Sequence, residues 1–398
     1  MDLEASFMDF DLLEVARKGC FSVVDLALEN LELYEFSVDS QDENGNTLLH
    51  YAAATGNLDT TSKLITLGAY TNILNNKGET PLHVACLQAQ LPIAELLIKN
   101  GANINATDFA KETPVFKAVR GGNRKLTKFI LSKGAILNRY NIINEGLLHL
   151  SVIHDDIELA KLLLDHEEDP NEFTNAGETP VHLAVKHSNI AMLKLLISGN
   201  AEITNRDFNN RTLLHLAVKC GDTEICKELI SAGLDINSAD REGTTPLHLA
   251  TELNNSAMVS LLVEKKADVS LEDIDGYTAL HVAAKTRDSS EVLKTLTNNG
   301  ASLDAKTFNG DLPIHVAAGS GNIEAFMFLY KKTETAVTNG IGLTATQVAE
   351  INGDPVMLRL LKDLDKNNNS GIPVPVQKKP RARRNSVRFS INTTFTKE

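Results

Sequence analysis

Few cysteines and the absence of a long apolar run limit the class of protein that this chain can be. The four cysteines (Cys20, Cys86, Cys220 and Cys226) lack the spacing of metal ligands, so we expect reduced, partly buried thiols inside the cell. No apolar run reaches the length of a membrane-spanning helix. The acidic start, residues 1–4, lacks the layout of a signal peptide. We therefore expect a cytoplasmic protein without membrane insertion.

Motifs that mark common enzyme classes are also missing. The chain has no P-loop, no dinucleotide-binding glycine fingerprint, no nucleophile elbow and no HExxH motif. His154, Asp155 and Asp156 resemble an acid–base trio, but consecutive residues point in different directions around a turn. We expect no catalytic residue, no cofactor and no metal site, and we interpret the chain as non-enzymatic.

Histidine recurs at a fixed period through most of the chain. Positions 33 residues apart from 50 to 281, followed by steps of 34 and 32, define what we call the anchors. The residues before the anchors repeat as well, for example Gly-Glu-Thr-Pro-Leu-His in 78–83. A fixed period in this range indicates a solenoid of stacked units. The anchors are His50, His83, Phe116, His149, His182, His215, His248, His281, His315 and Gln347.

The residues of one period predict two helices and a hairpin. Thr80 can cap a helix that begins at Pro81, where a missing amide hydrogen costs nothing. A second helix near Pro92 carries an apolar stripe of Ile93, Leu96 and Leu97. Gly101 can end this helix in the left-handed conformation. Asparagine, glycine and aspartate in the connecting segments are typical of a tight hairpin.

The Thr-Pro-Leu-His motif and its period resemble the ankyrin repeat, over residues 40–365. The resemblance implies an all-α ankyrin-repeat solenoid of about ten stacked helix-turn-helix units with β-hairpin loops. It also implies that each anchor histidine ties adjacent turns together and that partners bind the concave side. We divide the chain into a helical cap or degenerate repeat (1–40), the solenoid (41–365) and a basic, disordered tail (366–398).

Charge is unevenly divided along the chain. Residues 366–398 carry +7, so the formal total of −13 leaves −20 for residues 1–365. The position four residues before the anchor holds glutamate in four successive repeats, and Tyr277 occupies it later. These glutamates would form an acidic line that attracts a basic partner segment and raises its association rate. The alternative is a solvated position that accepts any polar residue. The line consists of Glu79, Glu112, Glu145 and Glu178.

A second column, seven residues before the anchor, holds five apolar side chains where a polar residue is usual. Aromatic side chains surrounded by charge are typical of binding hot spots. The alternative is that each one packs sideways against its neighbouring hairpin. The five are Phe109, Ile142, Phe208, Ile274 and Phe308. From the two columns we predict as partner-binding residues Glu79, Phe109, Glu112, Ile142, Glu145, Glu178, Phe208, Tyr277 and Phe308.

Departures from the repeat pattern cluster in residues 110–170. Phe116 replaces the anchor histidine, Gly146 replaces the capping threonine, and Glu167-Glu168 stands where Gly-Ala is expected. Loss of a threonine cap costs about 1 kcal/mol. We predict that this segment is the weakest of the solenoid and opens before the rest.

The sequence of the tail is typical of a regulatory segment rather than of a folded one. Asparagine, glycine and proline after Lys366 indicate a flexible linker. Arg383-Arg384-Asn385-Ser386 resembles a basophilic-kinase site, and phosphate on Ser386 would add about −2 charge. Segment 387–389 faintly resembles a phosphatase-docking motif. A basic run resembles a nuclear-import signal and consists of Lys378, Lys379, Arg381, Arg383 and Arg384.

These observations favour a protein–protein interaction scaffold or adaptor, monomeric and cytoplasmic, with the nucleus as a second location if the basic run acts. The alternative is a regulatory subunit of a kinase, a phosphatase or a transcription factor, controlled by the tail. Such a tail could fold back onto the glutamate line until Ser386 is phosphorylated. The −20 body would repel a nucleic acid, so we expect none as partner. An enzyme would require a pocket with convergent polar groups.

Overall fold

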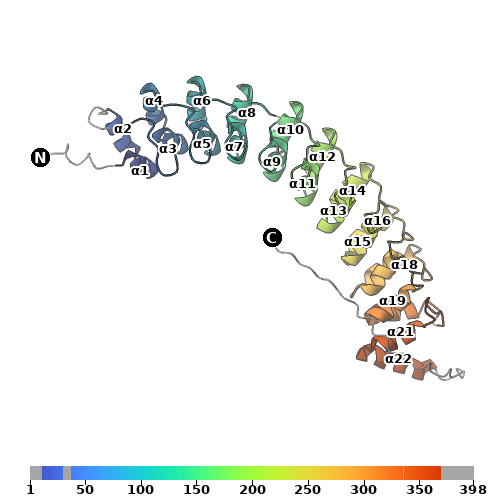
Figure 1. The fold of residues 1–398 in the computed structure, drawn as a ribbon. Coiled ribbons are helices and arrows are strands. Elements are labelled where there is room, and N and C mark those ends of the chain that lie inside the picture. The colour runs from blue at the N-terminus through green and yellow to red at the C-terminus, as the bar shows by residue number, and fades with distance from the viewer. Residues whose placement is uncertain (1–10, 30–36, 138, 335, 369–398) are drawn as a thin grey trace.

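The computed structural model describes residues 11–29, 37–137, 139–334 and 336–368, with the backbone alone for 363–368. Paired helices stack side by side in one continuous curved array (Figure 1). The predicted all-α solenoid is therefore confirmed. The predicted disorder of the tail beyond position 368 lies outside the described residues, as do Ser386 and the basic run from Lys378 to Arg384.

Each unit of the stack contributes a first and a second helix. Between α3 and α16, Figure 1 shows the first helices on the inner side of the arc and the second helices on the outer side. The first helices are α1 (Leu12–Arg17), α3 (Leu48–Thr55), α5 (Pro81–Leu87), α7 (Pro114–Arg120), α9 (Leu147–Ile153), α11 (Pro180–Lys186), α13 (Leu213–Cys220), α15 (Pro246–Glu252), α17 (Ala279–Lys285), α19 (Pro313–Ser320) and α21 (Ala345–Asn352). The second helices are α2 (Phe21–Glu29), α4 (Leu58–Thr66), α6 (Leu91–Lys99), α8 (Arg124–Ser132), α10 (Ile157–Asp165), α12 (Ile190–Ser198), α14 (Thr223–Ser231), α16 (Ser256–Glu264), α18 (Ser290–Asn298), α20 (Ile323–Tyr330) and α22 (Pro355–Asn368).

The local sequence explains how each first helix begins. At α5, Thr80 is the N-cap and Pro81 the first helical residue. The Thr80 amide donates to Nδ1 of His83 over 3.1 Å, and the Thr80 hydroxyl lies 2.8 Å from the same nitrogen. Since Nδ1 accepts these bonds, Nε2 carries the ring proton. Threonine and histidine three residues apart therefore satisfy the helix start together.

The hairpin that precedes each first helix is fixed by a short polar side chain. In the hairpin of residues 75–79, Oδ1 of Asn75 accepts from the amides of Lys77 and Glu79 at 3.0 Å and 2.9 Å. Gly78 has a positive φ of 76°, which favours glycine. An aspartate or asparagine makes the same two bonds at positions 141, 207, 240 and 273. The predicted turn chemistry is thus present.

Two hydrogen bonds join most repeats to the next. The anchor histidine donates from Nε2 to a main-chain carbonyl 29 residues on, as His50 does to Glu79 over 3.0 Å. The amide at the hairpin tip donates to the preceding tip, as Phe109 does to Lys77 over 3.0 Å. Burial lowers the pKa of the anchor histidines, for example that of His248, so the rings are neutral at pH 7 and keep this tautomer. One apolar core runs through the stack, and Leu82, Leu97 and Phe116 are fully buried in it.

One junction lacks both connections. Within the described residues, the main-chain amide of Phe208 does not donate to the preceding hairpin tip. Nε2 of His182 likewise does not donate to a carbonyl of the following hairpin. The side-chain amide nitrogen of Asn205, close by in the sequence, is buried without a hydrogen-bond partner. The tip amide bonds of Ile142 and Asn175 are both formed, so the interruption lies outside the segment 110–170 that the sequence singled out. Early opening of that segment stays a prediction.

Candidate functional site

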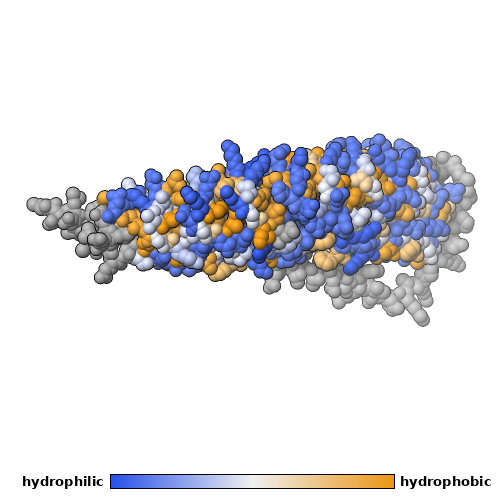
Figure 2. All heavy atoms as spheres, turned by 90° about the horizontal axis from the view of Figure 1, so that it is seen from above, coloured by the Kyte–Doolittle hydropathy of each residue, from blue (hydrophilic) through white to orange (hydrophobic). Residues whose placement is uncertain are grey.

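Apolar side chains project from the hairpin tips along the stack. We call them the tip row: they lie at the predicted column positions and at one further hairpin, and each is between 57 % and 79 % exposed. Figure 2 shows one face of the molecule, seen from above, on which hydrophilic and apolar side chains are interspersed. The tip row consists of Phe109, Ile142, Phe208, Ile274, Phe308 and Ile341. Sequence reasoning missed Ile341 because it lies six residues before the anchor Gln347, one place after the column position, which Gly340 occupies.

The rings of the tip row rest on glycines of the preceding hairpins. A Cβ atom added to Gly78 would lie 2.7 Å from the Phe109 ring, and one on Gly276 would lie 2.8 Å from the Phe308 ring. The ring of Phe208 is 3.5 Å from the same point on Gly177. Each ring thus packs sideways against its neighbour and still leaves most of its surface exposed. The column therefore combines the features of both interpretations, because its rings pack against neighbouring hairpins and are also exposed to solvent.

Two polar residues interrupt the tip row. Asn175 and Arg241 occupy the equivalent tips and are exposed. The side-chain amide of Asn175 donates to the carbonyl of Ile142 over 3.1 Å, so it ties adjacent hairpins together. The tip row is therefore a series of apolar contacts one or two repeats apart rather than one continuous patch.

The glutamate line is paired with cations of the same chain. Lys117, itself buried, lies 2.8 Å from Asp108, 3.1 Å from Glu112 and 3.3 Å from Glu79. Burial lowers the pKa of Lys117, but its hydrogen bonds to Asp108 and Glu112 outweigh this effect and raise the pKa. Burial likewise raises the pKa of Glu79, while Asn75 and Lys117 outweigh it and lower the pKa. These charges compensate one another within the fold.

Arg120 and Lys186 complete the pairing. Arg120 lies 2.6 Å from Glu112 and 3.6 Å from Glu145, and Lys186 pairs with Glu178. The sequence suggested an acidic line open to a basic segment. In the structure Lys117 and Arg120 of α7 face Glu79, Glu112 and Glu145, and Lys186 of α11 faces Glu178. Glu79 and Glu112 are also buried. Recognition of a partner by these four glutamates stays a prediction.

This ion network lies where the anchor histidine is missing. Phe116 fills the anchor position in the core and cannot hydrogen-bond, so the buried hydroxyl of Thr113 has no partner. Lys117, the next residue, joins the hairpins that contain Glu79 and Glu112, and Arg120 extends the connection to Glu145. Ion pairs thus join the repeats that a histidine joins elsewhere.

Tyr277 borders a hollow between hairpins and first helices near the end of the solenoid. Its ring meets that of His281 edge-on, with the centroids 5.7 Å apart, and burial raises the pKa of its hydroxyl. The hollow measures about 480 Å³, and Lys285, Asp311 and Ile341 also line it. A member of the tip row therefore borders a recess beside the first helices.

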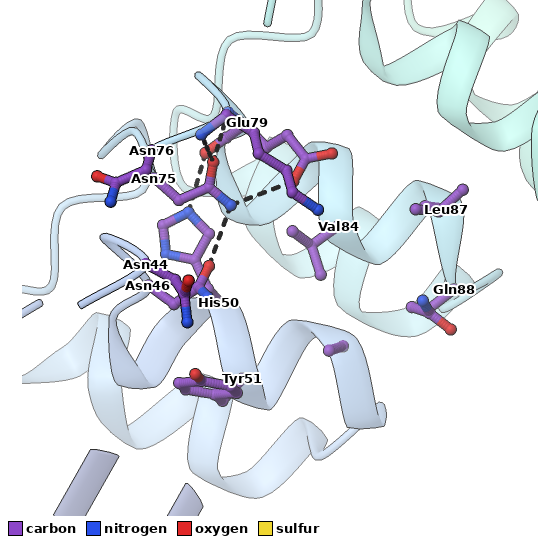
Figure 3. Close-up of a pocket in the computed structure, with 12 residues that line it drawn as sticks. Asn44, Asn46, His50, Tyr51, Asn75, Asn76, Glu79, Val84, Leu87 and Gln88 are labelled. Atoms are coloured by element: carbon purple, nitrogen blue, oxygen red, sulfur yellow. Dashed lines mark hydrogen bonds between the residues drawn. The ribbon is translucent and has the colours of Figure 1, made fainter. Parts of the chain in front are cut away.

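A similar hollow of about 450 Å³ lies at the other end of the solenoid (Figure 3). The amide of Asn75 donates to Asn46 over 3.0 Å and to Glu79 over 3.1 Å, and Nε2 of His50 bonds to the carbonyl of Glu79. Asn46, His50, Asn75 and Glu79, among the residues drawn in Figure 3, are thus bonded to one another. Such groups maintain a fold rather than await a substrate.

The acid–base trio has structural roles. Asp156 caps α10 by accepting from Leu159 over 2.9 Å, and it pairs with Arg124 over 2.7 Å. Asp155 accepts from the amide of Asn189 in the next repeat. Across the ranges that the structure describes, no group of three His, Cys, Asp or Glu residues is placed to hold a metal ion. Within the same ranges, no helix combines the length and the apolar character needed to cross a membrane.

A comparison with protein families matches ankyrin repeats (3 copies) over residues 12–108, 148–240 and 214–307. The chain belongs to the ankyrin-repeat family. Ankyrin repeats are generally protein–protein interaction modules. The matched ranges leave out 109–147, where this ankyrin-repeat protein carries Phe116, Lys117 and Gly146. A comparison with curated proteins found no match.

Proposed function

We propose that this ankyrin-repeat protein is a non-enzymatic scaffold or adaptor that holds a protein partner along the inner side of its arc. The single observation that carries the proposal is the tip row, an ordered series of exposed apolar side chains on a rigid stack. Ordered apolar exposure of this kind marks interaction surfaces.

Hairpins and first helices together line two hollows that such a partner would meet. The hollow in Figure 3 is lined by hairpin residues such as Asn76 and by first-helix residues such as Tyr51 and Val84. At the far end, Ile341 of a hairpin and Val348 of α21 line the second hollow. A partner that covers the tip row would therefore also meet the inner face of the first helices.

The energetics favour the three phenylalanines as the main contacts. Burial of a phenylalanine side chain stabilises a complex by about 1.5–3 kcal/mol. Phe109, Phe208 and Phe308 are already ordered against glycines or neighbouring backbone, so a partner would immobilise them at little entropic cost. The paired glutamates Glu79 and Glu112 would contribute specificity at most, because a basic segment would have to compete with Lys117.

A regulatory subunit remains the second candidate, because the basic tail carries Ser386 within a kinase-like site. Its basic run from Lys378 to Arg384 would direct part of the protein from the cytoplasm to the nucleus. We propose a monomer for either function. A tailless variant ending at Asn368 tests the regulatory role: an unchanged set of partners and unchanged affinity would count against it.

Affinity capture from cell extract tests the main proposal. We change Phe109, Phe208 and Phe308 together to serine. This variant should retain at least about tenfold less of each specific partner than the wild type, because hot-spot residues carry most of the binding energy. The matched control changes Leu58, Leu67 and Val356 to serine, which are exposed apolar residues at the ends of second helices, outside the tip row. Circular dichroism verifies that both variants fold. Equal retention of partners by the two variants would exclude the tip row as the contact.

A further inference from the structure

Two departures from the repeat pattern meet in one repeat. Glu168 stands where other repeats hold a small apolar residue, and it is only 4 % exposed. Gly146 stands where other repeats cap the first helix with threonine. The small residues equivalent to Glu168 include Ala69, Ala102, Ala267 and Ala301, which are likewise buried.

Glu168 uses the space that the missing threonine side chain leaves. A Cβ atom on Gly146 would lie 3.5 Å from Oε1 of Glu168 and 3.1 Å from the ring of Tyr140. A threonine at this position would therefore touch the carboxyl group and would require a small shift of the Tyr140 ring. In a regular repeat this space holds a hydroxyl that bonds to the anchor histidine, as Thr80 does to His83 over 2.8 Å. The two departures thus depend on each other.

No basic group compensates the carboxylate of Glu168. Its Oε2 is buried without a hydrogen-bond partner, and no lysine or arginine of the described residues forms an ion pair with it. Asp169 and Glu172, on its own segment, repel a negative charge there. Tyr140 faces it from the preceding hairpin, and burial together with Glu172 and Glu168 raises the pKa of that hydroxyl to about 12. An ionised Glu168 would therefore be an unpaired buried charge.

The basic group of this neighbourhood, His149 on α9, does not supply a counter-charge. Nδ1 of His149 accepts from the amide of Gly146 over 3.2 Å, and Nε2 bonds to the carbonyl of Glu178. Burial lowers the pKa of His149, so the ring is neutral near pH 7. Tyr140, His149, Asp169 and Glu172 thus provide no positive charge to pair with Glu168.

We propose that Glu168 is a proton-dependent switch, which holds segment 166–172 against the start of α9 when protonated and releases it when ionised. Burial, followed by repulsion from Asp169 and Glu172, raises the pKa of Glu168 to about 7. The switch therefore acts between about pH 4.5 and pH 7. It is independent of the proposed partner binding, although Ile142 of the tip row belongs to the hairpin between Tyr140 and Gly146.

The sign of the effect follows from linkage. A group whose pKa is raised in the closed state stabilises that state below its ordinary pKa of 4.5, and the stabilisation is lost as the pH rises through about 7. Between pH 5 and pH 8 the opening equilibrium should therefore increase by roughly 70-fold. A neutral side chain at position 168 should show no such increase.

Hydrogen exchange at pH 5, 6, 7 and 8 tests the switch on the full chain. The ratio of the wild-type exchange rate to that of Glu168→Gln is taken at each pH for amides of α9, α10 and 166–172, so that the chemical rate cancels. The ratio should rise by tens of times toward pH 8 there and stay constant in α15 and α16. Glu167→Gln, which removes an exposed neighbouring charge, is the matched control and should keep the wild-type pH dependence. A ratio independent of pH in α9 and α10 would overturn the proposal.

A second pair of variants tests the switch even if Glu168→Gln does not fold. Glu168→Ala restores the residue of other repeats and should also remove the pH dependence. Gly146→Thr should be less favourable for the thermal midpoint in the wild-type chain than in the Glu168→Ala chain, because the carboxyl group that touches the added side chain is absent there and the cap can form. The same effect of Gly146→Thr in both chains would show that the two positions do not interact, and the switch geometry would then be wrong.

Discussion

Replacement of Lys117 by methionine should be the most destabilising single change in the ion network. Methionine keeps most of the buried stem and removes only the charge. Asp108, Glu112 and Glu79, which lie 2.8 Å, 3.1 Å and 3.3 Å from Nζ, would then lose their common cation. Arg120 remains to compensate Glu112 but contacts neither of the other two.

The magnitude follows from the burial of the group. Removal of one partner of a buried ion pair costs about 3–5 kcal/mol, because the other charge stays in the interior uncompensated. An exposed pair contributes about 0–1 kcal/mol. Lys186, which pairs with Glu178 but is half-exposed, is therefore the matched control. We expect Lys117→Met to lose about 3–5 kcal/mol in free energy of unfolding at pH 7, and Lys186→Met to lose less than about 1 kcal/mol.

Urea denaturation at 25 °C, followed by circular dichroism at pH 7 and pH 4, measures both variants. The pKa values of Glu79 and Glu112 are lowered in the fold, so the stabilisation from their ionised forms exists above 4.5 and disappears as the pH falls through the folded values. The difference between wild type and Lys117→Met should therefore be largest at pH 7 and shrink at pH 4. Addition of Asp108→Asn, which places there the residue found at Asn75 and Asn141, should restore part of the loss.

A loss below about 1 kcal/mol for Lys117→Met would refute this reasoning, since it would equal the cost of an exposed pair. A loss that is the same at pH 7 and pH 4 would refute it as well. In that case packing of the lysine stem, rather than charge, would hold the two hairpins together.

Two further predictions concern buried side chains. Thr80→Val should lower the free energy of unfolding by about 1–2 kcal/mol, because it removes the hydroxyl that bonds to His83. Thr113→Val should leave this free energy unchanged, since the Thr113 hydroxyl has no partner beside Phe116. Equal losses for the two variants in urea denaturation would contradict this prediction. Cys20 and Cys220 should react with a thiol reagent in the native state, while Cys86 and Cys226 should react only after unfolding, because they are buried and burial raises the pKa of Cys226 to about 12. Rapid reaction of all four thiols in native buffer would show that the core is open.

The repeating part of the fold could be predicted from the sequence because its rules are local. Thr80, Pro81 and His83 define a helix start within four residues, and Asn75 and Gly78 define a hairpin within five. The exposed positions of Phe109, Ile142, Phe208, Ile274 and Phe308 also followed from their place before the anchor. Such features need only the period and the preferences of single residues.

The parts that the sequence did not predict depend on contacts between repeats. Nothing in the period shows that Lys117 reaches a carboxylate 38 positions earlier, and so the glutamate line was expected to face solvent. Gly146 and Glu168 were each noticed as departures, but their contact depends on how segment 166–172 folds back on α9. Pairwise compensation of this kind is visible only when both side chains have been placed in space.

The tie between repeats has a consequence for how this surface can change. Nε2 of the anchor histidine bonds to a main-chain oxygen, which every amino acid supplies. Glutamate at position 79, threonine at 244, tyrosine at 277 and leucine at 343 all serve equally as acceptors. Cohesion of the stack thus depends on main-chain atoms and not on the side chains of these residues. Mutation can therefore change the side chains at these positions one at a time, while the histidine bonds that join the repeats stay intact.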